Sequence, residues 1–130
     1  MKKPIIYSFI FLISLIAPLP AFSQWEKIFS TDNADFYFDN ESIKKTNRYV
    51  YWWDLVNYNE KQLEGSRSWK TFNQGDCEEY RTKTTKSMFY DKKWGEGNRL
   101  NLRTKRKINE WRYPNPKFMS YGLLKKICNY

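Results

Sequence analysis

The segment RYVYWWDLVNY, residues 48–58, carries the strongest β-strand signal in the chain and constrains how the rest can fold. Aromatic and β-branched residues dominate it, as is typical of strands. Its side chains alternate between two faces, with Tyr49, Tyr51, Trp53 and Leu55 on one and Val50, Trp52, Val56 and Tyr58 on the other. Both faces are apolar or aromatic. The segment therefore predicts a central strand that is covered on both sides, or covered on one side while offering an aromatic surface on the other.

The flanking sequence predicts a mostly β domain of the α+β class, with an antiparallel sheet of about six strands. Tyr, Trp, Phe, Thr and Val are abundant, helical periodicity is scarce, and turn-forming residues recur at short intervals. The other five strands are expected at residues 25–29, 35–38, 66–73, 78–90 and 99–111. Gly65 and the pair Gly75-Asp76 are interpreted as turn or bulge positions.

Two short helical segments are also expected. Residues 39–45 are interpreted as one turn of helix, because Asp39 or Asn40 can accept hydrogen bonds from the free amides at its start. After a change of direction at YPNP, residues 113–116, a helix is predicted from Ser120, its cap, to about Ile127. Such a short helix is marginal by itself, so it must be held against the sheet. Its apolar stripe consists of Leu123, Leu124 and Ile127.

The first 23 residues have the layout of a cleavable secretion signal. Lys2 and Lys3 precede an apolar run at residues 5–16, and small residues lie at the −3 and −1 positions of a cut after Ser23. A membrane anchor is the alternative, but the run is shorter than the roughly 17–25 residues that cross a bilayer. No cysteine follows it that could carry a lipid anchor. We expect an exported protein in the periplasm, at the cell surface or secreted, and not transmembrane after cleavage.

The remaining chain, residues 24–130, fits one small domain. Its only cysteines are Cys77 and Cys128, and an even pair in an exported chain normally forms a bridge. The sequence therefore predicts the disulfide Cys77–Cys128, which ties the C-terminal helix to the sheet. Free or metal-bound thiols are the alternative, but two cysteines in a chain without histidine make a poor metal site. The chain-entropy description gives such a bridge a stabilisation on the order of 4 kcal/mol.

The charge favours anionic partners. The whole chain carries +9, and loss of Lys2 and Lys3 with the signal lowers this to +7. Lipid head groups or lipopolysaccharide, acidic glycans and acidic proteins fit this balance. A basic surface that only maintains solubility is the alternative. Export argues against nucleic acid as the partner, and open sheet edges allow a monomer or a homodimer.

Catalysis is not expected. The chain contains no histidine, which removes the commonest general base and metal ligand. No spacing singles out a pair of carboxylates among Asp54, Glu60, Asp76, Glu78 and Glu79. We predict neither a metal site nor a cofactor.

Two surface features are candidates for binding. On the expected strand 99–111, one face is cationic, and a neighbouring strand can extend this patch; the candidate residues are Arg81, Lys83, Arg99, Arg103, Lys105 and Lys107. Protection of a sheet edge by lysines is the alternative interpretation. Most tryptophans are expected to be structural, because a small domain with few aliphatic residues builds its interior from rings. Trp94, beside Gly95 and Gly97 in a loop, is the expected exception and a candidate aromatic contact.

Several motifs follow one another in the order found in a known family. A tryptophan at the mature start is followed by DFYFDNESI (35–43), YVYWWDLVNY (49–58), GDCEEYRTK (75–83), WRYPNPKF (111–118) and LLKKIC (123–128). This pattern resembles the surface-adhesin protein E family over almost all of the mature chain. The resemblance implies a six-stranded antiparallel sheet with a disulfide-held C-terminal helix, residence in the periplasm or at the surface, and binding of host extracellular matrix. The two hypotheses are an exported binding protein and a periplasmic structural or envelope-maintenance protein resting on anionic lipid or lipopolysaccharide.

Overall fold

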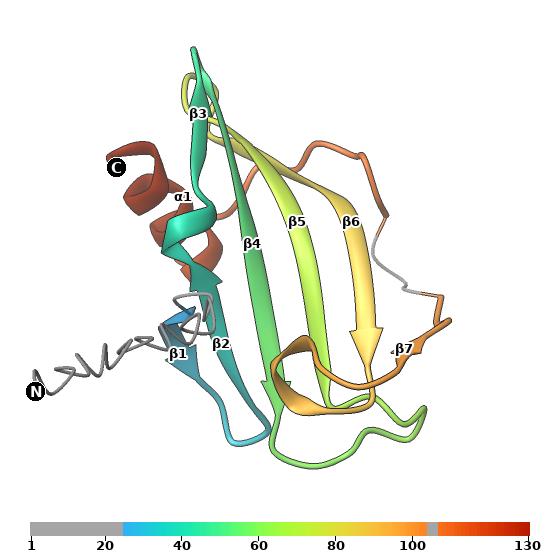
Figure 1. Ribbon diagram of the computed structural model, residues 1–130. Coiled ribbons are helices and arrows are strands. Elements are labelled where there is room, and N and C mark those ends of the chain that lie inside the picture. Colours follow the sequence, from blue (N-terminus) through green and yellow to red (C-terminus); the bar gives the residue numbers. More distant parts are fainter. Residues whose placement is uncertain (1–24, 104–106) are drawn as a thin grey trace, which may run out of the picture.

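A computed structural model describes residues 25–103 and 107–130 of the chain. The predicted signal segment, residues 1–23, lies outside these residues. One twisted antiparallel sheet runs through the molecule, and a single C-terminal helix packs against one of its faces (Figure 1). This confirms the mostly β, α+β class expected from the sequence.

The described residues form seven strands, in the sheet order β1-β2-β4-β5-β6-β7, with β3 paired to the start of β4. Two 3-10 turns, η1 (Asn40–Ser42) and η2 (Lys93–Gly95), and the helix α1 (Met119–Cys128) complete the elements. The strands are β1 (Trp25–Ser30), β2 (Ala34–Asp39), β3 (Lys44–Thr46), β4 (Tyr49–Tyr58), β5 (Ser68–Asp76), β6 (Arg81–Tyr90) and β7 (Arg99–Leu100). As predicted, β4 is central, lying between β2 and β5.

The core lies between α1 and one face of the sheet. It consists of Phe38, Val50, Trp52, Leu123, Leu124 and Ile127. Val50 and Trp52 are alternate residues of β4, and Phe38 comes from the neighbouring β2. The three helix residues are the predicted apolar stripe. Of the two possibilities for β4, the structure selects a strand that α1 covers on one face and that turns an aromatic face outward.

Gly75 lies inside β5, where the sequence predicted a turn or bulge, and this prediction was wrong. Both Gly75 and Asp76 pair with β4 and β6 in regular register. A Cβ atom at Gly75 would lie 2.5 Å from Cδ1 of Leu124 and 2.9 Å from Cγ2 of Val50. The glycine is therefore needed because α1 approaches the sheet backbone closely at this point.

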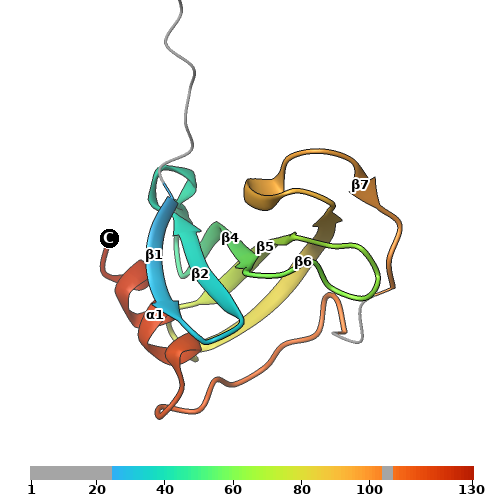
Figure 2. The ribbon, with the colours of Figure 1, turned by 90° about the horizontal axis from the view of Figure 1, so that it is seen from below.

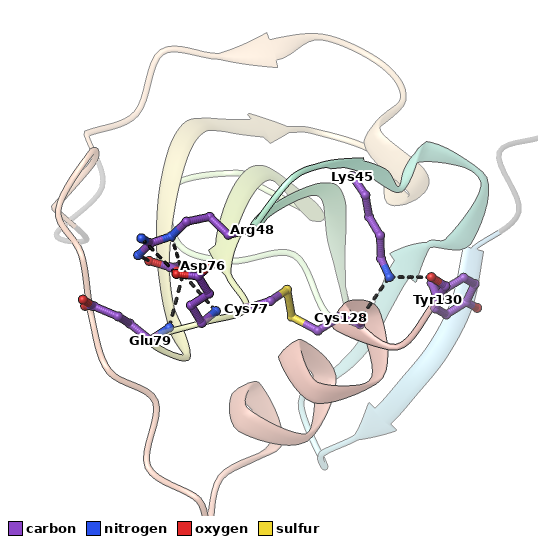
Figure 3. The surroundings of a disulfide bond; sticks show 8 residues. Lys45, Arg48, Asp76, Cys77, Glu79, Cys128 and Tyr130 are labelled. Carbon is purple, nitrogen blue, oxygen red and sulfur yellow. Dashed lines mark hydrogen bonds and ion pairs between the residues drawn. A yellow bond between two sulfur atoms is a disulfide. The ribbon is translucent and has the colours of Figure 1, made fainter.

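The predicted disulfide between Cys77 and Cys128 is present (Figure 3). Cys77 follows the last residue of β5, and Cys128 is the last residue of α1. The bridge closes a loop with a sequence separation of 51 and holds the helix end against the sheet. Lys45 of β3 adds to this attachment by donating hydrogen bonds to the backbone oxygens of Cys128 and Tyr130.

Among the described residues of the expected sixth strand, 99–103 and 107–111, only Arg99 and Leu100 form a strand, β7. Residues 101–103 and 107 have no regular structure, and Asn109 has a positive φ of 61°. A full strand beside β6 would have placed Arg103 and its cationic neighbours opposite the lysines of β6, and like charges on paired strands repel. Farther along the chain, Arg112 forms an isolated bridge with Thr82 of β6, and the amide of Asn109 donates to the backbone oxygen of Thr84 at 2.8 Å.

Other element boundaries also differ from the prediction. Residues 44–46 form the short strand β3, although the first turn of residues 39–45 is helical and Asp39 caps it, accepting from the amide of Glu41 at 3.0 Å. The strand expected at residues 78–90 begins at Arg81, after a turn. Helix α1 begins at Met119 after Phe118, so Ser120 lies inside the helix and is not its cap.

Candidate functional site

The face of the sheet turned away from α1 carries the rings of β4 and β5. Tyr49, Tyr51 and Trp53 alternate with the core residues of β4, and Phe72 of β5 is the direct partner of Trp53. We call this surface of β4, β5 and β6 the open face. Figure 2 shows α1 on one side of the sheet and the loop that follows β6 on the other.

The rings of the open face contact one another across strands. Phe72 lies between Trp53, at a centroid distance of 4.9 Å, and Tyr51, at 6.3 Å. Near the start of β4, Tyr49 stacks with Trp111 at 6.2 Å. All five side chains are half-buried. They are therefore fixed by packing while part of each ring remains accessible to a partner.

In the described part of the chain, five cationic side chains lie over these rings; one is Arg48, whose guanidinium lies 5.3 Å from the ring centroid of Tyr49. The Lys70 ammonium is 4.9 Å from the ring centroid of Trp53, and that of Lys86 is 5.7 Å from that of Phe72. Two further cations lie over the ring of Trp111, at 4.3 Å for Arg81 and 4.6 Å for Lys83. Such distances are within the range of cation–π attraction. The open face is thus both aromatic and positively charged.

An irregularity in β6 brings two of these cations to the same side. Phe72 pairs with Lys86, whereas the next residue of β5, Asn73, pairs with Thr84, so Thr85 is an extra residue in β6. In a regular strand, Lys83 and Lys86 would point to opposite faces because they are three residues apart. The bulge at Thr85 places both lysines on the open face.

The one carboxylate that β4, β5 and β6 contribute to the open face is that of Asp76, which is fully buried. Arg48 and Arg81 both form ion pairs with it, and the amides of Glu78 and Glu79 donate hydrogen bonds at 3.1 and 3.2 Å. Figure 3 shows Arg48 and Glu79 beside Asp76. These donors, chiefly Arg48, hold the pKa of Asp76 far below its usual range. Asp76 is therefore charged at neutral pH, but its negative charge is neutralised locally.

Trp94 stands at the other end of the open face, in η2. The centroid of its ring lies 4.8 Å from that of Tyr37, and 43% of the residue is exposed. Its backbone has a φ of 66°, an uncommon value for a residue with a side chain. The Trp94 amide donates to Oδ1 of Asn57 at 2.8 Å, and the Gly95 amide donates to Oγ of Ser68 at 2.9 Å. Both acceptors are buried residues of β4 and β5, which fix the loop to the sheet.

The structure brings together only some of the cations named from the sequence. Arg81 and Lys83 lie on the open face, close to Trp111. Arg99 is exposed in β7, Arg103 and Lys107 are exposed outside the strands, and Lys105 lies outside the described residues. The expected cationic face of a long strand 99–111 is therefore replaced by the cations of β5 and β6.

Lys70, Lys86, Phe72 and Trp111 were missed as site residues. For Lys70 and Phe72, the alternation Lys-Thr-Phe in β5 was an available signal, since it places both on the face opposite Thr71. Lys86 could not be assigned, because the bulge is not evident in the sequence. Trp111 could not be placed either, because it reaches the sheet from outside the strands.

A pocket of about 380 Å³ lies on the opposite side of the sheet. Residues of β1, β2, β4, β5 and β6 form its floor, and α1 and the segment before it form a wall. Asp54 in the floor accepts hydrogen bonds from Nε1 of Trp52 and from Nδ2 of Asn73, at 2.8 and 2.9 Å. This polar network links the floor strands to one another.

Neither a cluster of metal ligands nor a membrane-spanning helix occurs in the described part of the chain. Within the ranges 25–103 and 107–130, no three His, Cys, Asp or Glu side chains gather as ligands of a metal ion would. None of the helices in these ranges is long and apolar enough to cross a membrane.

Comparison with known proteins identifies the family. A family model described as surface-adhesin protein E matches residues 25–129. Two structures of protein E from Haemophilus influenzae have a similar fold, and each is 24% identical in sequence to this chain. The first has a TM-score of 0.68 and covers 86% of this chain and 89% of its own. The second, a crystal form II, has a TM-score of 0.64 and covers 86% of this chain and 92% of its own. The protein E structure from a non-typeable strain gives 0.63, covering 88% of this chain and 82% of that one, again at 24% identity. No curated protein sequence matched. The chain belongs to the surface-adhesin protein E family.

Proposed function

We propose that this protein is an exported, non-enzymatic binding protein that contacts an extracellular protein or an anionic polymer through the open face. The observation that carries this proposal is the set of half-buried rings and cations on one face of β4, β5 and β6. Rings fixed in a sheet offer a large contact area at a low cost in conformational entropy. The cations above them give the face a positive potential that attracts anionic partners.

Membership in a surface-adhesin family indicates an exported or cell-surface protein, and a binding protein more than an enzyme. We further propose that residues 1–23 are a cleaved signal and that the mature domain reaches the cell surface. Fractionation of the producing cells and antibody labelling of intact cells measure it directly. Surface labelling supports the role of an adhesin. Confinement to the periplasm contradicts that role and favours a ligand in the envelope, such as lipopolysaccharide or anionic lipid.

Binding through the open face can be tested with two charge-matched double variants. Lys83→Gln with Lys86→Gln removes two cations from the open face, and Lys117→Gln with Lys125→Gln removes two exposed cations near and within α1. Residues 24–130 of each form are tested on a plate coated with solubilised extracellular matrix. We expect the first variant to bind at least threefold more weakly and the second to bind like the wild type. Equal binding by all three forms excludes the open face, and no binding by the wild type contradicts an adhesin function.

A further inference from the structure

We propose that the ligand of the open face is an acidic polysaccharide. Its sugar rings would pack over the row formed by Tyr51, Phe72 and Trp53, and its carboxylate or sulfate groups would pair with Lys70, Lys83 and Lys86. This inference rests on the function proposed above and narrows its ligand to one chemical class.

The row of rings has the form that a chain of sugars can use. Tyr51 and Trp53 are alternate residues of β4, and Phe72 lies beside them on β5, with centroid distances of 6.3 and 4.9 Å. A pyranose ring is flat and presents a patch of C–H groups, whose partial positive charge is attracted to the negative face of an aromatic ring. A row of partly accessible rings can therefore take up successive sugar units of one chain.

The cations lie where the acidic groups of such a chain would be. The ammonium groups of Lys70 and Lys86 lie within 6 Å of the rings of Trp53 and Phe72. A sugar stacked on either ring would bring its substituents beside these ammonium groups. A carboxylate or sulfate there would form a charge-assisted hydrogen bond, which is stronger than the contact of the cation with the ring. A neutral sugar has no charged group that could replace the contact between the cation and the ring.

The arrangement of Lys70 favours a hydrated glycan over a closely packed protein. Its ammonium lies near two indole rings, 4.9 Å from the centroid of Trp53 and 5.7 Å from that of Trp25. Its aliphatic stem packs against Gly95, which fixes its direction. The desolvated centre of a protein interface is depleted in lysine, because a buried ammonium without a matched partner is costly. A polysaccharide leaves the ammonium groups in contact with water while it covers the rings.

The surface is long enough for a polymer. Rings and cations extend along the strands from Trp111 and Arg81, near the start of β6, through Phe72 in the middle to Tyr37 and Trp94 near η2. Within β4, β5 and β6 the only acid on this side is Asp76, and it is already paired with two arginines. A polyanion crossing these three strands therefore meets no unpaired negative charge.

The first test compares four polymers of similar length by equilibrium binding to residues 24–130. Heparin and polygalacturonate combine sugar rings with negative charge, dextran supplies neutral sugar rings, and poly-L-glutamate supplies charge without sugar. We expect both acidic polysaccharides to bind, dextran to bind at least tenfold more weakly, and poly-L-glutamate to bind at least threefold more weakly than polygalacturonate. Equal binding of poly-L-glutamate would show that the face recognises acidic chains of any kind, including acidic proteins, and overturns the proposal. If dextran binds as strongly as the acidic polysaccharides, the cations have no role in binding and the proposal is overturned.

The second test uses variants with matched controls. Phe72→Leu removes the ring at the centre of the row, and Phe118→Leu removes an exposed ring outside the sheet. We expect about a threefold to tenfold loss of polygalacturonate binding for the first, comparable to the contribution of one ring contact, and no change for the second. Circular dichroism of both variants verifies the fold, and retained binding by a folded Phe72→Leu protein contradicts the proposal.

The matrix assay described above separates the two proposals. If loss of Lys83 and Lys86 abolishes matrix binding while the wild type binds no acidic polysaccharide, the open face is a binding site but its ligand is not a glycan. If the wild type binds neither, both proposals fail.

Discussion

Lys83 and Lys86 project from the same face of β6 although they are three residues apart, because Thr85 is an extra residue that restores the same orientation after the bulge. Lys83 lies over Trp111 and Lys86 over Phe72, so the two lysines serve different parts of one aromatic surface. The positive charge of the open face thus depends on the bulge in β6 as well as on the number of lysines in the strand.

This relationship predicts a strong salt dependence of polyanion binding. Raising the NaCl concentration from about 0.05 to 0.5 M should weaken polygalacturonate binding, because salt screens exposed charges and competes for them. The double variant Lys83→Gln, Lys86→Gln should show a shallower slope of log affinity against log salt than the wild type. The variant Lys117→Gln, Lys125→Gln should keep the wild-type slope. Identical slopes for all three proteins would place the ionic contacts elsewhere.

Substitution of Gly75 should destabilise the fold by a steric mechanism. In Gly75→Ala, the new methyl group would meet Leu124 at 2.5 Å and Val50 at 2.9 Å, so α1 has to move away from the sheet. We expect a loss of about 1–3 kcal/mol in the free energy of unfolding. Gly122→Ala within α1 is the control, since nothing lies within 4 Å of the position that its methyl group would take, and it should stabilise the helix by about 0.5–1 kcal/mol. Urea unfolding measures both, and a neutral Gly75→Ala would refute the close contact.

The disulfide between Cys77 and Cys128 should be a major source of stability. On the chain-entropy description, a loop of this length contributes about 4 kcal/mol. The double variant Cys77→Ser, Cys128→Ser, or reduction of the wild type, should therefore lower the free energy of unfolding by a comparable amount. Exchange of backbone amides with deuterium should increase first in α1, because the bridge holds its last residue. Uniform exchange with unchanged stability would contradict this role.

The ion pairs of Asp76 predict acid sensitivity. Arg48, Arg81 and two backbone amides lower the pKa of Asp76 in the folded protein below its ordinary value of about 3.9. The stabilisation is therefore complete above about pH 4 to 5 and is lost as the pH falls from there toward the lowered pKa, because only the unfolded state then takes up the proton.

The variant Asp76→Asn tests this assignment. It leaves two arginines without their shared carboxylate, and we expect a loss of about 2–3 kcal/mol at pH 7, less than for a fully buried pair because both arginines are partly exposed. The difference in stability between wild type and variant should shrink as the pH falls below about 4, where the unfolded carboxyl takes up its proton. Unfolding curves between about pH 2 and 7 measure it, and a difference independent of pH would assign the loss to packing.

The sequence alone predicted the elements whose signals are local. The alternation in residues 48–58 identified β4, the spacing of Leu123, Leu124 and Ile127 identified the buried side of α1, and the two cysteines of an exported chain identified the bridge. The first two depend on side-chain periodicity within one segment, and the bridge was predictable because the chain has only two cysteines, which leaves one pairing within the chain. The family resemblance, carried by motifs along the same segments, was confirmed as well.

Other features of the fold could be found only in the tertiary structure, because they depend on contacts between segments that are distant in the sequence. Gly75 resembled a turn, because nothing near it in the sequence reveals that α1 packs against it. Residues 99–111 alternate like a strand, but in their described part only Arg99 and Leu100 form a strand beside β6, where further cations would repel its lysines. The composition of the sequence determined that this would be a basic, ring-rich sheet. The bulge at Thr85 and the return of Trp111 determined which cations and rings share a face, because side-chain direction depends on the pairing register, and pairing is set by the neighbouring strand.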